Sequence, residues 1–395
     1  METRRHMASI RPVHQRGVGI IETMVGLLIG MVVVLVIYNT LIVSEAYKRS
    51  TLGVSDAQIT GQLTQFVLGR ELSSGGNGVM AGIDELARCD EFRLRPIPAL
   101  IGDGGGPMVS DDITVFYSNS PTIVHPVWFG GAGASPSPYP VISPNGFKIN
   151  DWVIATEARS GSLNCTLVQV TGITQFPSLA AYPPADVGGR IALTFTLKAG
   201  TAFNHTTDSR AVNLGPRVTR TTYSLNAAKQ QLDSLDGNPG LAVAATPVPV
   251  AQNVVLLKAQ YGINADGDAQ GLVDCWTSAV AAGCPNGVDY SKAAFQVVPA
   301  PATIVAAPSN LTFGGFIRTV KAVRIAIVVR SDDDVKVDAT NATLLNQTAW
   351  LFNCAANNAT CQGRMQIDRT VLNDYRRYRI YEATIPLRNS IWHPI

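Results

Sequence analysis

The sequence predicts an α+β protein: one long amino-terminal helix, membrane-spanning in its first half, packed on a mainly antiparallel β head with long loops. An apolar run with a single acid occupies residues 18–43, and a bilayer-spanning helix needs about 20 apolar residues. A helical pattern without proline then continues to Leu72. The rest of the chain alternates short β-rich segments with turns, in keeping with its 35 glycines and 23 prolines.

Residues 1–17 form a basic leader that we expect to stay in the cytoplasm. The leader has one acid, Glu2, against four arginines, at Arg4, Arg5, Arg11 and Arg16. Because positive charge is retained on the cytoplasmic side, the helix that follows is expected to point outward. A secretory signal would place a small-residue cleavage site after the apolar run, and no convincing one follows residue 43. The expected organisation is therefore a leader over 1–17, a helix over 18–72, and a periplasmic or extracellular head over 73–395.

Glu22 lies near the start of the apolar run, where an ordinary membrane anchor has no use for an acid. A carboxylate in hydrocarbon costs a few kcal/mol and therefore needs a partner. A cut after Gly17 would create a new amine at Val18, within about one helical turn of Glu22. The carboxylate of one copy could then pair with the new amine of a staggered neighbouring copy.

The segment from Arg16 to Tyr38 resembles the class III signal of type IV prepilins and type II secretion pseudopilins. Gly17 matches the residue before the cut, and Glu22 matches the fifth mature residue, which the family uses for subunit registration. Val18 matches the first mature residue and departs from the usual Phe or Met. The resemblance implies cleavage between Gly17 and Val18 and N-methylation of Val18 by a prepilin peptidase. The alternative is a single-span anchor whose glutamate has no role.

The second half of the helix is expected to be amphipathic and to lie against the head. Its large apolar residues recur at helical spacings, with polar residues between them, at Leu52, Ile59, Leu63, Phe66 and Leu72. Residues 73–78 read Ser-Ser-Gly-Gly-Asn-Gly, which is strong helix-stop chemistry.

Beyond the helix, β-rich segments predict strands over 113–118, 151–157, 165–171, 191–197, 218–225, 230–235, 254–262, 321–330 and 378–387. Residues 220–232 are expected to form a hairpin with its turn near Asn226. The glycine- and proline-rich segments 129–140, 235–249 and 297–310 predict long loops.

The six cysteines all lie beyond the membrane span, and an even count in an exported domain predicts disulfides. Fifteen pairings are possible in principle. Two pairs are close in sequence, Cys275–Cys284 and Cys354–Cys361, which leaves Cys89–Cys165. Zinc is the alternative, but there is no C-x-x-C and no histidine near either close pair.

Asn264, Asp266 and Asp268 stand at alternate positions, like the start of a calcium loop. The pattern then departs, because Ala269 stands where the EF-hand needs glycine and Cys275 where it needs glutamate. A plain Asx-rich turn is the alternative to calcium. No catalytic constellation is present, so we expect a protein that is not an enzyme.

A cluster of charges near the carboxyl end, Arg376, Arg377, Arg379, Glu382 and Arg388, admits two interpretations. One is the exposed face of an edge strand that resists unwanted pairing. The other is a contact surface for a partner. The net charge of the chain is only +2, which gives no indication of nucleic-acid binding.

Several blocks of the helix and the head resemble the PilW type of minor pilin. Residues 61–72 keep the apolar frame and the Arg-acid-Leu ending of that family's helix, although several positions depart. Similar blocks follow in the family's order, at 151–155 with 165–171, at 253–268, and at 320–331 with 378–389.

The resemblance implies a low-abundance subunit at or near the tip of the type IV pilus that primes assembly and supports twitching motility and adhesion. Its partners would be other minor pilins, a tip adhesin, the major pilin, the prepilin peptidase and the inner-membrane assembly platform. It would span the inner membrane once with its head in the periplasm, and then move to the pilus tip at the cell surface. The alternatives are a type II secretion minor pseudopilin of the GspJ kind, whose heads are usually shorter, and an anchored periplasmic binding protein or hydrolase.

Overall fold

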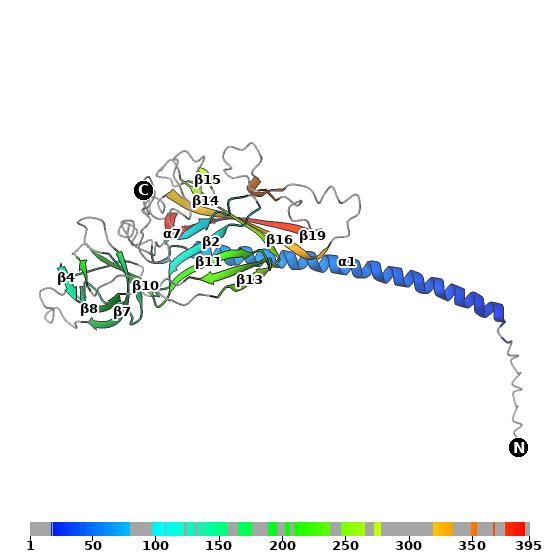
Figure 1. Ribbon diagram of the computed structural model, residues 1–395, viewed down its shortest axis with the longest axis horizontal. Coiled ribbons are helices and arrows are strands. Elements are labelled where there is room, and N and C mark those ends of the chain that lie inside the picture. The colour runs from blue at the N-terminus through cyan, green and yellow to red at the C-terminus, as the bar shows by residue number, and fades with distance from the viewer. Residues whose placement is uncertain are drawn as a thin grey trace, which may run out of the picture. The chain divides into compact units, whose positions relative to one another are not determined.

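One helix and a set of antiparallel sheets make up the protein (Figure 1). The computed structural model describes residues 17, 19–79, 97–106, 108–121, 125–130, 133–136, 138–156, 165–175, 189–195, 202–205, 209–237, 246–264, 272–277, 319–334, 349–353, 366–367 and 376–391. The chain divides into two compact units, Met1–Gly53 and Val54–Ile395. Within the described ranges every strand pair is antiparallel. The predicted fold class, a long apolar helix with a β head, is therefore confirmed.

Helix α1 spans Ile20–Ser74 without interruption. It ends where the stop chemistry predicts, because Gly76 and Gly78 take left-handed φ values of 77° and 69°, which glycine adopts without steric cost. The amide of Gly76 donates to the carbonyl oxygen of Phe116 at 2.8 Å. The carboxyl end of the helix is thereby attached to the neighbouring strand β2 (Asp112–Ser118).

The first head sheet has five strands. Their order in space is β1 (Ala99–Gly102), β2 (Asp112–Ser118), β11 (Val218–Asn226), β12 (Gln231–Asp236) and β13 (Val248–Gln252). Strands β11 and β12 are the predicted hairpin, with Asn226 opposite Gln231 across the turn.

The second head sheet has four strands. Their order is β15 (Cys275–Thr277), β14 (Val254–Ile263), β16 (Val320–Asp334) and β19 (Arg376–Pro386). The two central strands are mostly apolar and are buried along most of their described length, whereas the edge strand β19 alternates between exposed and half-buried residues along most of its length. Within the described residues β19 is an edge strand, as the first interpretation of the carboxyl-terminal charges requires; the role of the charges stays a prediction. Helix α7 (Arg388–Ile391) follows β19 in the chain. A two-stranded ribbon, β17 (Ala349–Trp350) with β18 (Gln366–Ile367), lies between β16 and β19 in the chain.

A third sheet, between β2 and β11 in the chain, has six strands. Their order is β3 (Val127–Trp128), β10 (Arg210–Gly215), β6 (Trp152–Thr156), β7 (Cys165–Gln175), β8 (Gly189–Phe195) and β5 (Tyr139–Val141). A bridge between Phe129 and Val141 joins the first and last strands. This bridge connects the two ends of the strand order, so that the sheet closes into a barrel.

The loop expected over residues 129–140 is therefore wrong. Part of it forms β5, and another part forms β4 (Gly133–Pro136), which pairs with β9 (Ala202–His205). Strand β5 is the last strand of the six-stranded sheet, whereas β4 and β9 form a separate two-stranded ribbon. Prolines and glycines fit such short strands, where few ladder hydrogen bonds are required of them.

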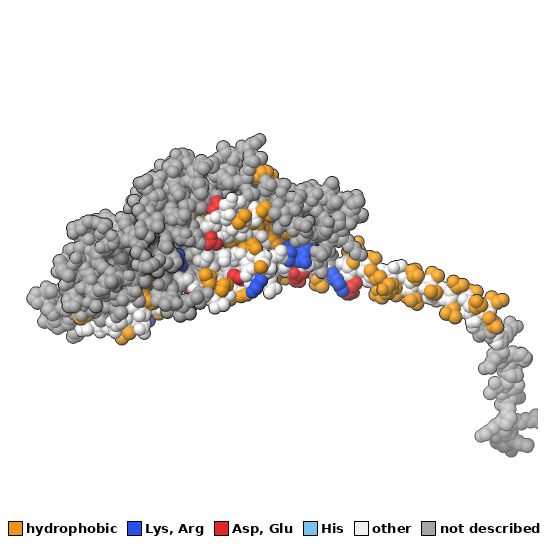
Figure 2. Space-filling view, viewed as in Figure 1, with side chains coloured by type: hydrophobic (Ala, Val, Ile, Leu, Met, Phe, Trp, Pro, Cys, Tyr) orange, Lys and Arg blue, Asp and Glu red, His pale blue; other side chains and the backbone are white. Residues whose placement is uncertain are grey.

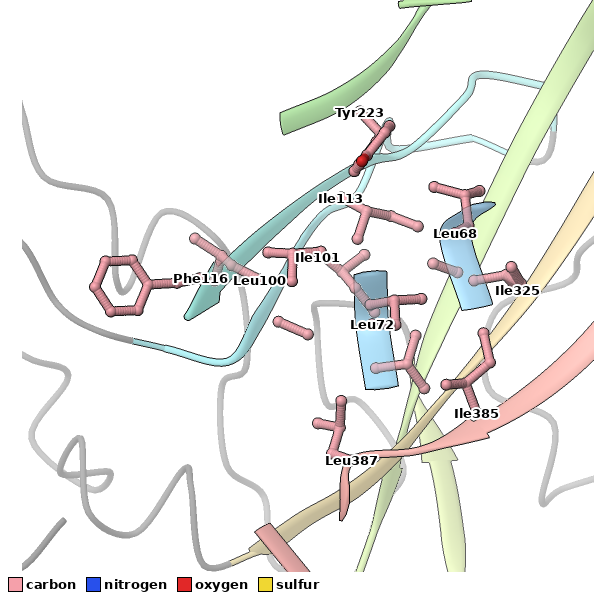
Figure 3. Packing of buried hydrophobic residues seen from close by; sticks show 14 of the residues in the cluster. Leu68, Leu72, Leu100, Ile101, Ile113, Phe116, Tyr223, Ile325, Ile385 and Leu387 are labelled. Atoms are coloured by element: carbon pink, nitrogen blue, oxygen red, sulfur yellow. The ribbon is translucent and has the colours of Figure 1, made fainter. Parts of the chain in front are cut away.

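The two head sheets and the second half of α1 share one apolar core. Leu68 and Leu72 of the helix are fully buried, and Figure 3 shows them among Ile325, Ile385 and Leu387. A buried ion pair also links the sheets: Lys258 Nζ on β14 lies 2.7 Å from Asp111 Oδ1, beside β2. The second carboxylate oxygen accepts the amide of Ala259 at 2.8 Å, so both oxygens of the buried charge are satisfied.

Candidate functional site

The first half of α1 is an apolar surface whose described side chains are exposed. Every large apolar side chain from Ile20 to Val43 is between 45% and 79% exposed, and Figure 2 shows them along the helix. This half is long and apolar enough to cross a membrane. Exposed apolar patches larger than a few hundred Å² mark contact surfaces in folded proteins. Such a surface is suited to contact with lipid or with other apolar helices.

Glu22 is the one ionisable acid in this surface, and it occupies the first turn of the helix. Helix α1 begins at Ile20, and the amides of Glu22 and Thr23 both donate to the carbonyl oxygen of Gly19, at 2.9 and 3.1 Å. A carboxylate in a first turn is favoured by the helix dipole. The side chain is exposed, so it is accessible to a cation supplied by another molecule.

The predicted cleavage site adjoins this turn. Gly17 is described and exposed, whereas Val18 lies outside the described residues. Cleavage and N-methylation stay predictions, because the structure contains the uncut chain.

The second half of α1 packs on the head through small and apolar residues. Its buried side, spaced by three and four residues, consists of Ala57, Gly61, Thr64, Leu68, Glu71 and Leu72. At Gly61 the helix passes directly under β19, because an added Cβ would collide with the Tyr381 ring. Beside it, Gln65 Nε2 donates to the carbonyl oxygen of Glu382 at 3.1 Å.

The predicted stripe of this half is wrong for four of its five residues. Leu72 is buried, but Leu52, Ile59, Leu63 and Phe66 are 53–67% exposed. At 100° per residue, these four lie together on the side opposite the buried one. The helix therefore carries two apolar sides, and the head takes the one with small residues because it allows closer approach. The outer four residues are apolar and exposed, as are the large apolar side chains of the first half.

A polar contact holds the end of α1 to β2. Glu71 accepts a hydrogen bond from the Tyr117 hydroxyl at 3.0 Å and one from Arg70 at 2.8 Å. Burial, together with the negative charge of Glu71, raises the pKa of the Tyr117 hydroxyl. The phenol therefore remains a donor to the carboxylate at physiological pH. Sequence reasoning missed this contact and the one at Gly61, since neither follows from a local pattern.

The cysteine and calcium predictions fall mostly outside the described residues. Cys275 is disulfide-bonded and the backbone of Cys165 lies in β7, whereas Cys89, Cys284, Cys354 and Cys361 lie outside. Asn264 is buried, and its backbone amide donates to the carbonyl oxygen of Thr319 at 2.9 Å. Asp266 and Asp268 lie outside the described residues, and no metal-binding cluster of His, Cys, Asp and Glu occurs within them. The three pairings and the calcium loop stay predictions.

A protein-family model matches the carboxyl-terminal part of the head. Residues 217–389 match the family model of PilW, the type IV pilus-assembly protein W. The PilW match runs from the start of β11 to the end of β19, so it contains the whole four-stranded sheet. No curated protein matches the chain.

Among solved structures, the chain is similar to a type IV-like pilin from Thermus thermophilus, with 12% identity over 61% of this chain and 86% of that one, at a TM-score of 0.21. The PilW match, together with the apolar helix and the β head, supports a pilin related to type IV pilus assembly.

Proposed function

We propose that this chain is a minor pilin that primes assembly of the type IV pilus and sits at or near its tip. The observation that carries the proposal is the exposed apolar half of α1 with Glu22 in its first turn. Its role is structural: the helix leaves the membrane and enters a bundle of like helices. Cleavage after Gly17 by the prepilin peptidase supplies the amine of Val18, which is then methylated.

The energetics of this transfer favour a pair between Glu22 and that amine. The free energy of the aliphatic side chains changes little when other apolar helices replace lipid around them, because both surroundings are apolar. A bare carboxylate would be costly in either place. A neighbouring amine removes that cost only in the correct stagger, so the same contact stabilises the bundle and sets its register. The major pilin, other minor pilins and the assembly platform are the proposed partners in this step.

Placement at the tip is supported by where the barrel leaves the head. The amide of Ser118, the last residue of β2, donates to the carbonyl oxygen of Asn77 at 2.8 Å, just beyond the carboxyl end of α1. Residues 119–217 therefore leave the head sheet next to the carboxyl end of α1, whereas the membrane segment is at its amino end. A subunit stacked on that end would meet the barrel, which favours a position with no subunit above it. A tip adhesin is the partner we propose there.

The Glu22→Ala variant tests the assembly role. We expect normal cleavage, because the peptide bond at Gly17 is unchanged, and loss of the protein from sheared pili by at least about tenfold, a difference of about 1.4 kcal/mol or more. Immunoblots of the membrane and pilus fractions measure both. Glu45→Ala is the matched control, since Glu45 is an exposed acid on the same helix beyond the apolar run.

Two results would contradict the proposal. One is a mature protein that still begins at Met1 by mass spectrometry, which would favour an anchored periplasmic protein. The other is recovery of Glu22→Ala in pili at the wild-type level. Recovery of the wild-type protein with type II secretion pseudopilins instead of pilins would reassign it to that system.

A further inference from the structure

We infer that residues 119–217 are an inserted module, and that α1 with the two head sheets forms a complete assembly unit without it. The inference rests on the proposed role in assembly. The inference goes further than that role, because it assigns assembly to α1 with the two head sheets and treats residues 119–217 as an addition that assembly does not require.

The first observation is the register at the points of insertion. Strands β2 and β11 are neighbours, paired from Tyr223 opposite Ile113 to Val218 opposite Ser118. Ser118 and Val218, the two residues that flank the insert, are therefore direct partners across the ladder. A two-residue turn would join such a pair as an ordinary β-hairpin. The head sheet is complete up to the point where the insert begins, and it resumes at the opposite residue.

The second observation is that the insert has its own closed fold and core. The six strands of the barrel all come from residues 127–215. The amides of Gly130 and Ile142 donate to Pro140 and Trp128 at 2.9 and 3.0 Å, next to the closing bridge. One apolar cluster, separate from that of the head, contains Phe129, Tyr139, Val141, Phe147, Val153, Ala155, Val168, Val170 and Ala211. A sheet that closes on itself and has its own core needs no strand from the head.

The third observation is the way the barrel is attached. The opposite faces of its central strands contribute Trp152, Ile154, Leu167, Val212 and Leu214 to the head cluster. At the junction, the amide of Asn119 donates to the Leu214 carbonyl at 3.0 Å, and the Ser118 hydroxyl donates to the Asn213 carbonyl at 3.2 Å. The barrel is thus packed on the head and not joined by a flexible linker. The PilW match begins at Arg217 and includes no barrel strand.

The test uses the full-length chain with the insert replaced by Asn-Gly, a pair that favours the hairpin turn. We expect the replaced protein to be cleaved normally and to reach sheared pili within about twofold of the wild-type level. Because the replacement uncovers apolar residues of the head, a second variant keeps the packing. Val153→Asp places a charge inside the barrel core, and Val323→Asp does the same in the head core; both valines are fully buried.

Limited proteolysis and immunoblots of pili measure the outcome. Val153→Asp should lose protease resistance in the barrel alone and still enter pili within about twofold, whereas Val323→Asp should fall by at least about tenfold. If Val153→Asp or the replaced protein keeps a protease-resistant head and is nevertheless absent from pili, the inference is overturned. Degradation of Val153→Asp to the same extent as Val323→Asp would also overturn it. Absence of the wild-type protein from pili would instead refute the proposed function itself.

Discussion

At the scale of single residues, the contacts that hold α1 to the head depend on shape more than on hydrophobicity. Gly61 faces β19 with no room for a Cβ, while Gly69, two turns later, has open space around it. A glycine inside a helix costs about 1 kcal/mol relative to alanine. At Gly61 this cost is offset by the close approach to Tyr381, whereas at Gly69 no contact offsets it.

Alanine at the two glycines should therefore have opposite effects. Gly61→Ala is expected to lower the free energy of unfolding by about 1–3 kcal/mol, because the new methyl group must displace the ring of Tyr381. Gly69→Ala is expected to raise it by up to about 1 kcal/mol through helix propensity. Denaturant unfolding of the full-length protein in detergent, followed by near-ultraviolet circular dichroism, compares the two. Equal effects would argue against the close contact at Gly61.

At the scale of elements, α1 contacts its own head and, in our proposal, other subunits with opposite sides of one helix. The side on the head is polar at Thr64 and Glu71 and apolar at Leu68 and Leu72. The outer side is exposed and apolar at Leu63 and Phe66. Stability of the head and entry into the filament should therefore depend on different residues only a few positions apart.

Substitutions on the two sides of α1 separate these roles. Leu63→Gln combined with Phe66→Gln should leave the melting temperature of the head almost unchanged, since both side chains already face solvent, and should lower recovery in pili several-fold. Leu68→Gln should cost about 2–5 kcal/mol of stability, because it removes core contacts and buries an amide. Thermal unfolding and pilus blots on the same samples give both readouts. A large loss of stability in the outer-side variant would show that these residues pack on the head.

At the scale of the whole molecule, the two sheets and the helix form one core from segments far apart in the chain, and tyrosines lie within or beside it. Burial is the main cause that raises the pKa of Tyr117, Tyr223, Tyr261 and Tyr381 above the ordinary value. A group whose pKa is raised on folding contributes stability that is present below its unfolded pKa and is lost as the pH rises through its folded pKa. For these tyrosines the loss begins above pH of about 10.

The native protein should therefore form phenolate at higher pH than the denatured chain. We expect the ultraviolet absorbance change of tyrosine ionisation to lag in the native protein and to coincide with loss of near-ultraviolet circular dichroism. Tyr117→Phe removes one of the delayed groups and should reduce the amplitude of the lag. Superimposable titrations of native and denatured protein would contradict the burial of these hydroxyls.

The sequence was sufficient for the features that depend on local chemistry. Neighbouring residues alone indicate four features: the apolar run, the isolated Glu22, the helix stop at residues 73–78 and the hairpin around Asn226. The helix and its stop, the hairpin, and the long strands β14 and β16 lie where the sequence predicts them. The strands β3 and β5 were missed because two or three residues carry too little periodicity to be distinguished from a loop. The six-residue strand β10 was missed because it is buried along its whole length and therefore lacks the alternation of a half-buried strand.

Only the tertiary structure decided which side of α1 faces the head and that residues 127–215 close into a barrel. Both outcomes depend on partners far along the chain: the space beneath Tyr381 selects the side with Gly61, and the bridge from Phe129 to Val141 joins the edges of a sheet. A periodic pattern states that a face is apolar, but it does not state which surface that face meets. That choice is made by steric fit and by hydrogen bonds between distant segments, and neither exists until the chain is folded.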